Sequence, residues 1–316
     1  MKTHRIKTNT DEMKVSQLVM GSAVKMRNLE KKELFSLYDQ YLDRGGNCID
    51  TARAYDDGRI EELVGDYIAY RGQRESVIIS TKCCHPSSDG KPRLDYVDMK
   101  QDLEQSLKAL KTDYVDILWL HKDDERCRVE KIVDDMNLLL KDGTVRMIGC
   151  SNWKVHRIEA ANEYARKSNQ AGFLASQIQW SIAYTEEKHF RQFGSVIMDE
   201  NAYEWYLQKK LPVFAYSPQA QGFFSKLDEG GEDMLSKMLT TCYLNTKNRE
   251  VYQRIKKFAQ EHEVPVSVPV LAYLLNNRLT CFPVFGVTSK KMLDEALLAT
   301  EICMTPEEAD QLYMEM

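Results

Sequence analysis

The chain of 316 residues lacks the sequence signals of several large protein classes. It has no run of 18 apolar residues, so we expect no membrane-spanning helix. The first residues, Met1–Arg5, precede no apolar segment, so we expect no signal peptide. The net charge of −5 leaves no basic excess for binding nucleic acid or an anionic membrane. These absences favour a cytoplasmic globular protein whose partners are small molecules.

The cysteines also lack a functional pattern. Eight are present, without the spacing of a metal site or of a Cys-x-x-Cys redox pair. Several stand inside apolar, strand-like segments, where cysteine behaves as a small hydrophobic residue. We therefore expect reduced core thiols and no metal ion. A metal-dependent hydrolase is further disfavoured, because of the six histidines only His121 is well placed at the end of a strand-like segment.

A Gly-x-Gly-x-x-Gly motif after an early strand, typical of the doubly wound dinucleotide-binding sheet, is absent as well. Instead, eight apolar segments rich in β-branched residues alternate with segments of helical period. The predicted strands are Leu18–Met20, Cys48–Asp50, Val77–Ser80, Val115–Leu120, Val145–Cys150, Ala175–Ile178, Pro212–Tyr216 and Thr280–Val284. The predicted helices are Lys31–Arg44, Ile60–Tyr70, Tyr96–Leu110, Val129–Lys141, Val155–Lys167, Ala202–Lys209, Arg249–Glu261, Pro269–Asn277, Met292–Ala299 and Pro306–Met314. This alternation predicts an α/β fold, a closed (β/α)8 TIM barrel that forms one domain over residues 1–316.

Three further segments complete the predicted fold. A β-hairpin is expected ahead of the barrel, from Arg5–Lys7 and Lys14–Val15. His85–Arg93 and Ser217–Lys247 are longer than ordinary βα connections. Both follow predicted strands, so we expect them on the carboxyl face of the barrel, where active sites of this fold form.

Four reactive side chains stand at the ends of three successive predicted strands. Asp50 ends one strand, and Tyr55 follows it on the loop. Lys82 stands at the carboxyl end of the next strand, just beyond Ser80, and His121 directly follows the strand after it. A free tyrosine has a pKa of about 10, and a nearby cation lowers that value by roughly 1–3 units. Lys82, held by Asp50, would make Tyr55 a better proton donor to a carbonyl oxygen that His121 could orient.

Taken singly, these residues can also be explained by a structural role. A lysine and an aspartate at strand ends often form no more than a structural ion pair, and a histidine after an apolar strand is more often a satisfied structural residue. All four at successive strand ends favour a catalytic constellation.

Asp50-Thr51-Ala52-x-x-Tyr55, followed by Glu61-Glu62-Leu63-Val64-Gly65, resembles the signature of the aldo-keto reductases. The resemblance runs through almost the whole chain, with the segments in the family's order. It implies a (β/α)8 barrel and hydride transfer between a nicotinamide cofactor and a carbonyl or alcohol. The catalytic tetrad that it implies is Asp50, Tyr55, Lys82 and His121.

Further matches imply where the cofactor binds. Gly149-Cys150-Ser151-Asn152 resembles the family's Gly-x-Ser-Asn motif, which implies that Ser151 and Asn152 hold the carboxamide together with Gln177. Ala215-Tyr216-Ser217-Pro218 resembles the segment whose tyrosine stacks on the nicotinamide ring, which implies this role for Tyr216. The pyrophosphate loop would then contain Ser217, Gln219 and Gly222.

The adenosine end of the cofactor would lie along Phe285–Ala296, where Gly286, Ser289 and Glu295 are the implied contacts. Two residues depart from the family here. An arginine that many members use for the 2′-phosphate aligns with Met292, and the usual asparagine after the glutamate is Ala296.

These departures leave the cofactor open. Lys290 and Lys291 stand close to a helix N-terminus, where they could bind a phosphate or be merely solvated. NADP is the family's usual cofactor, and NAD use or dual use is the alternative.

The residues after His121 depart from the family as well. Asp123 and Asp124 could accept hydrogen bonds from a polyhydroxylated substrate such as a sugar, or they could be solvated loop or helix-capping groups. Trp153 could add an aromatic wall to the substrate site.

The sequence therefore predicts an NAD(P)H-dependent oxidoreductase that reduces an aldehyde or ketone to the alcohol, or catalyses the reverse. A sugar-derived carbonyl is one hypothesis for its substrate. The alternative is a nucleotide-sensing regulatory subunit with slow or vestigial chemistry.

Overall fold

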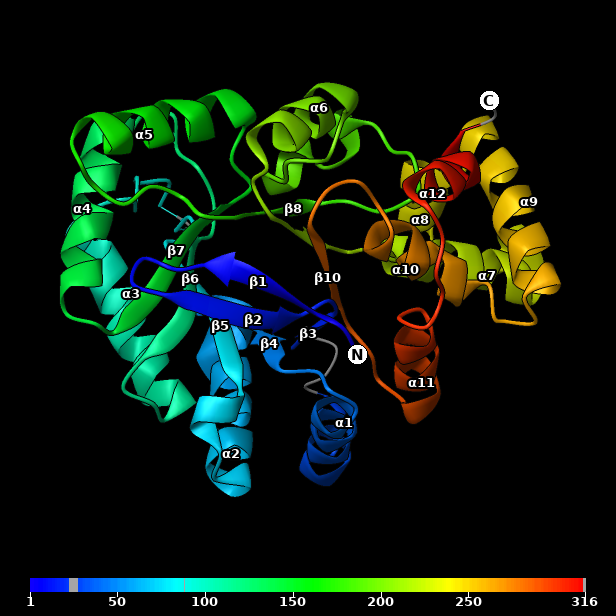
Figure 1. The fold of residues 1–316 in the computed structure, drawn as a ribbon, viewed down its shortest axis with the longest axis horizontal. Helices are drawn as coiled ribbons and strands as arrows, with labels where there is room; N and C mark the ends of the chain where they lie inside the picture. Colours follow the sequence, from blue (N-terminus) through cyan, green and yellow to red (C-terminus); the bar gives the residue numbers. More distant parts are fainter. Residues whose placement is uncertain (23–27, 88, 315–316) are drawn as a thin grey trace.

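The computed structural model describes residues 1–22, 28–87 and 89–314, so Ser88 of the predicted His85–Arg93 loop lies outside the described residues. Within them, eight parallel strands close into a barrel in the order β10-β3-β4-β5-β6-β7-β8-β9 (Figure 1). The strands are β3 (Val19–Gly21), β4 (Cys48–Asp50), β5 (Ile78–Cys83), β6 (Val115–Leu120), β7 (Val145–Ser151), β8 (Ser176–Gln179), β9 (Val213–Tyr216) and β10 (Cys281–Phe285). The predicted (β/α)8 barrel is confirmed.

Helices surround the barrel and connect its strands (Figure 1). Those of the first six βα units are α1 (Lys31–Asp43), α2 (Arg59–Arg71), α3 (Tyr96–Leu110), α4 (Val129–Lys141), α5 (Val155–Lys167) and α6 (Glu200–Lys209). Between β9 and β10 lie α7 (Phe223–Gly230), α8 (Lys237–Tyr243), α9 (Thr246–Glu261) and α10 (Ser267–Leu275). After β10 come α11 (Lys290–Leu298) and α12 (Pro306–Tyr313). Side-chain caps fix several helix starts: Asp95 begins α3 by accepting a hydrogen bond from the Asp98 amide, for example.

The long segment Ser217–Lys247 is more structured than its sequence indicated, because it contains α7 and α8. Phe223 and Phe224 are buried at the start of α7, and the Ser236 hydroxyl caps α8 by accepting from the Leu239 amide. The next helix, α9, begins at Thr246 and not at the predicted Arg249, because Asn245 caps it. Burial and caps, rather than a long periodic pattern, create these short helices.

The predicted hairpin is confirmed, with strands β1 (Thr3–Lys7) and β2 (Glu12–Ser16) that are longer than predicted. Figure 1 shows it lying across the barrel. Its side chains Ile6, Met13 and Val15 pack with Val19, Cys48 and other residues inside the barrel as one apolar cluster. The hairpin thus fills one end of the barrel with side chains and leaves the site to the other end.

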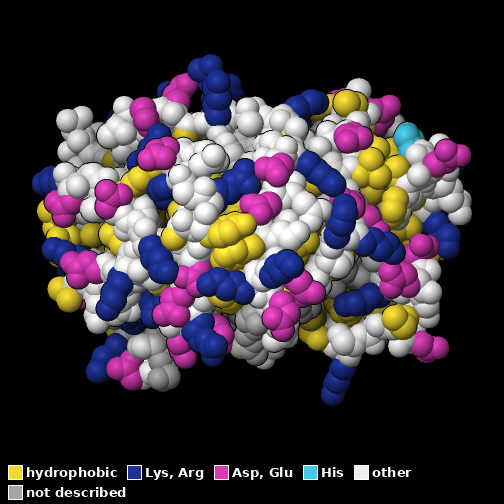
Figure 2. Space-filling view, turned by 90° about the horizontal axis from the view of Figure 1, so that it is seen from below, with side chains coloured by type: hydrophobic (Ala, Val, Ile, Leu, Met, Phe, Trp, Pro, Cys, Tyr) yellow, Lys and Arg dark blue, Asp and Glu magenta, His cyan; other side chains and the backbone are white. Residues whose placement is uncertain are grey.

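Basic and acidic side chains are interspersed over the face of the molecule that Figure 2 shows. This agrees with the modest net charge of −5. No helix among the described residues is long and apolar enough to cross a membrane.

Candidate active site

Parallel strands bring the predicted tetrad to one rim of the barrel. Asp50 is the last residue of β4 and pairs in register with Ser80 of β5, and Lys82 pairs with Trp119 of β6. The backbone continues this register beyond the strands, because the His121 amide donates to the carbonyl of Cys83. The carboxylate, the ammonium and the imidazole therefore come from three adjacent strands.

Asp50 and Lys82 form the buried centre of the site. The Lys82 Nζ lies 2.6 Å from Asp50 Oδ2 and also donates to the Thr51 carbonyl at 2.6 Å. The other carboxylate oxygen accepts from Ser80 Oγ at 2.7 Å and from Gln177 Nε2 at 3.0 Å. Both Asp50 oxygens are thus occupied, which fixes the carboxylate beneath the ammonium.

Trp119 and Ser80 hold this carboxylate from behind. The Trp119 Nε1 donates to Ser80 Oγ at 2.6 Å, and Ser80 Oγ in turn donates to Asp50. Gly149 of β7 makes room for the indole, since a Cβ built there would lie 2.3 Å from the Trp119 ring. The glycine that opens the Gly-Cys-Ser-Asn motif therefore has a packing reason of its own.

Tyr55 begins a short 3-10 turn, Tyr55–Gly58, directly beyond β4. The Lys82 ammonium lies 5.0 Å from the centre of the Tyr55 ring. Burial alone would lower the pKa of Lys82, but Asp50 and Tyr55 together raise it above its ordinary value. Lys82 is therefore a cation at neutral pH, and it stands beside the phenol.

His121 supplies a neutral imidazole beside the phenol. Its ring centre lies 6.1 Å from that of Tyr55. Burial, followed by the charges of Lys82, His85 and Lys122, holds its pKa well below 6.5. Its Nδ1 is buried without a hydrogen-bond partner among the described residues. At neutral pH this side chain can donate one hydrogen bond to an oxygen without carrying charge.

His85, which the sequence marked only as the start of a loop, also lies beside this group. Its ring lies edge-on to that of His121, with centres 4.8 Å apart. The only feature of the sequence that could have pointed to His85 was its position, three residues after Lys82 and just beyond the end of the same strand. Burial lowers the pKa of His85 as well.

Ser151 and Asn152 end β7 next to this group. Asn152 has a left-handed backbone, with φ of 59°, and its side-chain amide makes four hydrogen bonds. Its Nδ2 donates to the His121 carbonyl and to Ser151 Oγ, and its Oδ1 accepts from the Val196 amide and, at 2.7 Å, from the Tyr216 hydroxyl. Asn152 thus connects the loops after β6, β7, β8 and β9.

The implied carboxamide ligands are therefore adjacent, and their side chains already make hydrogen bonds within the site. Ser151 and Gln177 are almost fully buried, and the Gln177 amide donates to Asp50. Tyr216, at the end of β9, is partly exposed, and its hydroxyl is fixed by Asn152. The donor set of two side-chain amides and a hydroxyl, next to an anchored aromatic ring, fits a nicotinamide and its carboxamide.

The loop after β9 has the backbone expected of an anion site. Ser217, Ala220, Gln221 and Gly222 have φ values of 52°, 46°, 56° and 79°, all in the left-handed region. Gln219 precedes the short turn, and Gly222 immediately precedes α7. This backbone forms a tight turn ahead of α7, in which the Ala220 and Gly222 amides donate to the Ser217 and Gln219 carbonyls. Successive N–H groups in turns of this kind can form an anion site.

At the implied adenosine end, Gly286 follows β10 and Ser289 caps α11 by accepting from the Met292 amide. Glu295 Oε2 accepts from Ser267 Oγ at 2.5 Å. Lys290 forms an ion pair with Asp294 at 2.8 Å, so its ammonium is not free for a phosphate in this structure.

The three residues proposed as substrate contacts do not have the free side chains that the sugar hypothesis requires. Asp123 makes two 2.9 Å hydrogen bonds to the Arg157 guanidinium, and Asp124 is bound by Arg126. Trp153 has no exposed surface and packs edge-on against Phe173. Arg157 also lies over the Trp153 ring, at 5.3 Å from its centre. These contacts favour the structural alternative for Asp123 and Asp124 and place Trp153 in the core.

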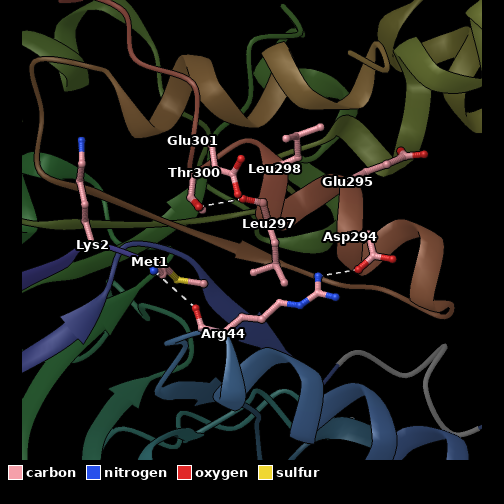
Figure 3. Close-up of a pocket in the computed structure, with 9 residues that line it drawn as sticks. All are labelled: Met1, Lys2, Arg44, Asp294, Glu295, Leu297, Leu298, Thr300 and Glu301. Atoms are coloured by element: carbon pink, nitrogen blue, oxygen red, sulfur yellow. Dashed lines mark hydrogen bonds and ion pairs between the residues drawn. The ribbon is translucent and has the colours of Figure 1, made fainter. Parts of the chain in front are cut away.

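A cavity of about 640 Å³ lies elsewhere, between the first residues of the chain, Arg44 after α1, and the α11 region (Figure 3). Its lining includes none of the tetrad and, of the implied cofactor contacts, only Glu295. Arg44 crosses it to pair with Asp294 at 2.5 Å. Within the described residues, no three His, Cys, Asp or Glu side chains are grouped to hold a metal ion.

Comparison with known proteins places this site in context. The sequence model of the Aldo/keto reductase family matches residues 17–313. An aryl-alcohol dehydrogenase of Pestalotiopsis microspora is 25% identical, over 98% of this chain and 81% of its own length. The aryl-alcohol dehydrogenase [NADP(+)] of Phanerodontia chrysosporium is 25% identical, over 90% and 76%.

Solved structures show the same fold. The aldo-keto reductase of Klebsiella pneumoniae, in complex with NADPH, superposes with a TM-score of 0.73 at 23% identity, over 99% of this chain and 94% of its own. The chain therefore belongs to the aldo/keto reductase family, a family of NAD(P)-dependent oxidoreductases, as the motifs around Asp50 and Ser151 implied.

Proposed function

We propose that this chain is a single-domain, NADP(H)-dependent enzyme that interconverts an aldehyde or ketone and the corresponding alcohol. The observation that carries the proposal is the Lys82 ammonium, buried against Asp50 at 2.6 Å and standing beside the Tyr55 ring. A structural ion pair would not need a phenol and a neutral imidazole beside it. The combination suits a proton donor to a carbonyl oxygen.

In this mechanism the reduced nicotinamide, when bound, supplies hydride to the carbonyl carbon. Tyr55 donates its phenolic proton to the carbonyl oxygen, and Lys82 stabilises the phenolate that remains. Asp50 keeps Lys82 charged and in place. His121 donates a hydrogen bond that orients the carbonyl oxygen, and its neutrality keeps a second cation out of the site. In the oxidative direction, the Tyr55 phenolate accepts the proton of the alcohol.

The chain's own residues also support binding of the cofactor. Ser151, Asn152 and Gln177 would hold the carboxamide, and Tyr216 would stack on the ring. For this, Asn152 and Gln177 must exchange some of their present hydrogen bonds for bonds to the cofactor, which need cost little because the number of bonds is conserved. Solved relatives of this fold that bind NADPH, and the NADP(+) enzyme of Phanerodontia chrysosporium, make NADP the first choice.

The names of the curated relatives suggest aryl aldehydes and aryl alcohols as the first substrates to try. The test is steady-state oxidation of NADPH with a panel of aromatic, aliphatic and sugar aldehydes, and reduction of NADP with the matching alcohols. We expect turnover on the order of 1–10³ per second with at least one aldehyde class. Tight NADPH binding without turnover of any member of the panel would instead support the nucleotide-sensing subunit.

A further inference from the structure

The loop after β6 brings an unpaired ammonium group to the edge of the candidate site. Lys122 directly follows His121, and its side chain is partly buried. Within the part of the chain that the structure describes, no hydrogen bond or ion pair satisfies its Nζ. A partly desolvated ammonium without a partner costs free energy, and burial lowers the pKa of Lys122 accordingly.

The two carboxylates that follow Lys122 in sequence do not compensate it. Asp123 points to Arg157, which binds both of its oxygens, and Asp124 is held by Arg126. Of the four successive charged residues Lys122–Glu125, Lys122 is the one without a partner among the described residues, since Glu125 pairs with Lys154.

Other carboxylates at this rim are engaged as well. Asp102 accepts from Arg93 and from the Cys84 amide. Glu186 pairs with Lys188 in the loop after β8. Neither of these carboxylates pairs with Lys122.

The side chain of Lys122 bridges two loops of the site. A Cβ built on Gly194, in the loop after β8, would lie 3.1 Å from the Lys122 Nζ and 3.4 Å from its Cδ. Lys122 thus lies across a residue that has no side chain, two positions before Val196, whose amide binds Asn152. Its charge acts on both His121 and His85.

We propose that Lys122 binds an anionic group, in the first instance a carboxylate, carried by the carbonyl substrate at a distance from its reacting carbon. This inference rests on the proposed function, since it names the substrate class of the same site. The substrate's anion would supply the partner that Lys122 lacks, while the carbonyl oxygen meets Tyr55 and His121. A neutral polyhydroxylated substrate would leave the ammonium unpaired.

The test compares a charged and a neutral form of the same aldehyde, formylbenzoate and its methyl ester, each as the meta and para isomer. The kcat/KM ratio of acid to ester is measured for the wild type, Lys122→Met, Lys122→Arg and Lys188→Met. Lys188 is an exposed lysine of the same rim that is already paired with Glu186, so its variant is the matched control.

We expect the wild type to prefer the acid for at least one isomer. Lys122→Met should lower the ratio by about 10- to 100-fold, mainly through KM, because a hydrogen bond to a charged group contributes about 1.5–3 kcal/mol. Lys122→Arg should keep most of the preference, and Lys188→Met should keep all of it.

Two results would overturn the inference and leave the proposed function intact: turnover of acid and ester with equal kcat/KM by the wild type, or the same fall in ratio for Lys188→Met as for Lys122→Met. Absence of NADPH-dependent turnover with acid, ester and every other aldehyde would overturn the proposed function itself, and the inference with it.

Discussion

The Lys82 ammonium and the Asp50 carboxylate lie 2.6 Å apart, and both side chains are almost completely buried. Stability alone does not explain such a buried pair, because replacing a buried ion pair by apolar side chains is often neutral or stabilising. In the function proposed above, the reason is Tyr55, because the charge of Lys82 acts on the phenol beside it.

Removal of one partner should therefore be costly for stability. Asp50→Asn and Lys82→Met should each lower the free energy of unfolding by about 3–5 kcal/mol, because either leaves the other group buried without its counter-charge. The double variant should lose less than the sum of the two. Urea unfolding measures all three, and additive losses would argue against a direct pair.

Asp123 and Arg157 give a second stability prediction. Both side chains are largely buried, at 10% and 13% exposed, and they share two hydrogen bonds. Asp123→Asn should lower the free energy of unfolding by about 2–3 kcal/mol, because it weakens a charge-assisted pair. The matched control is Asp124→Asn, whose partner Arg126 is mostly exposed.

The same two variants decide the sugar hypothesis. For each variant we compare kcat/KM with sugar aldehydes to kcat/KM with aryl aldehydes. We expect this ratio to stay within about threefold of the wild-type ratio, which corresponds to less than 1 kcal/mol, because both carboxylates are bound by arginines. A selective tenfold loss with sugar aldehydes, at unchanged stability, would restore Asp123 or Asp124 as a substrate contact.

His121 predicts a pH dependence. Because its pKa in the folded state lies well below 6.5, the unfolded chain takes up a proton as the pH falls below about 6.5 while the folded chain does not. The stability that neutral His121 contributes is therefore complete above about pH 6.5, and it is lost as the pH falls towards the folded-state pKa.

The measurement is the free energy of unfolding of wild type and His121→Gln between about pH 7 and pH 5. The wild type should lose up to about 1.4 kcal/mol more per pH unit below 6.5 than the variant. Parallel curves would show that the buried imidazole titrates normally.

The adenosine end can be tested by restoring the residue that the family uses. Met292 is exposed near the start of α11, and Lys290 there is paired with Asp294. Met292→Arg should strengthen binding of NADPH over NADH by about tenfold, because a guanidinium binds phosphate through charge-assisted hydrogen bonds. Met292→Leu is the control. Fluorescence titration gives both dissociation constants, and an unchanged NADPH-to-NADH ratio would mean that the 2′-phosphate lies elsewhere.

The barrel and the grouping of Asp50, Lys82 and His121 could be predicted because both follow from local patterns. Eight alternating segments define the parallel strands, and each tetrad residue lies at or just beyond the end of such a segment. The helices α7 and α8 were missed since they depend on the burial of Phe223 and Phe224 and on the Ser236 cap.

The surroundings of the tetrad could not be predicted for a different reason. Asp123 lies in the loop after β6 and its partner Arg157 lies 34 residues later on α5, and no local pattern links the two. The same applies to Lys122, whose missing partner is visible only when the neighbouring loops are in place. Contacts between loops of different βα units decide what the charges do, and sequence spacing does not encode them.

The central claim is that Tyr55 is the proton donor, and Tyr55→Phe tests it most directly in single-turnover reduction of an aryl aldehyde by bound NADPH. The account predicts a rate about 10²- to 10⁴-fold below that of the wild type, with an NADPH dissociation constant within about twofold, because the phenol acts on the substrate oxygen and not on the cofactor. A Tyr55→Phe variant that reduces the aldehyde within tenfold of the wild-type rate would contradict it.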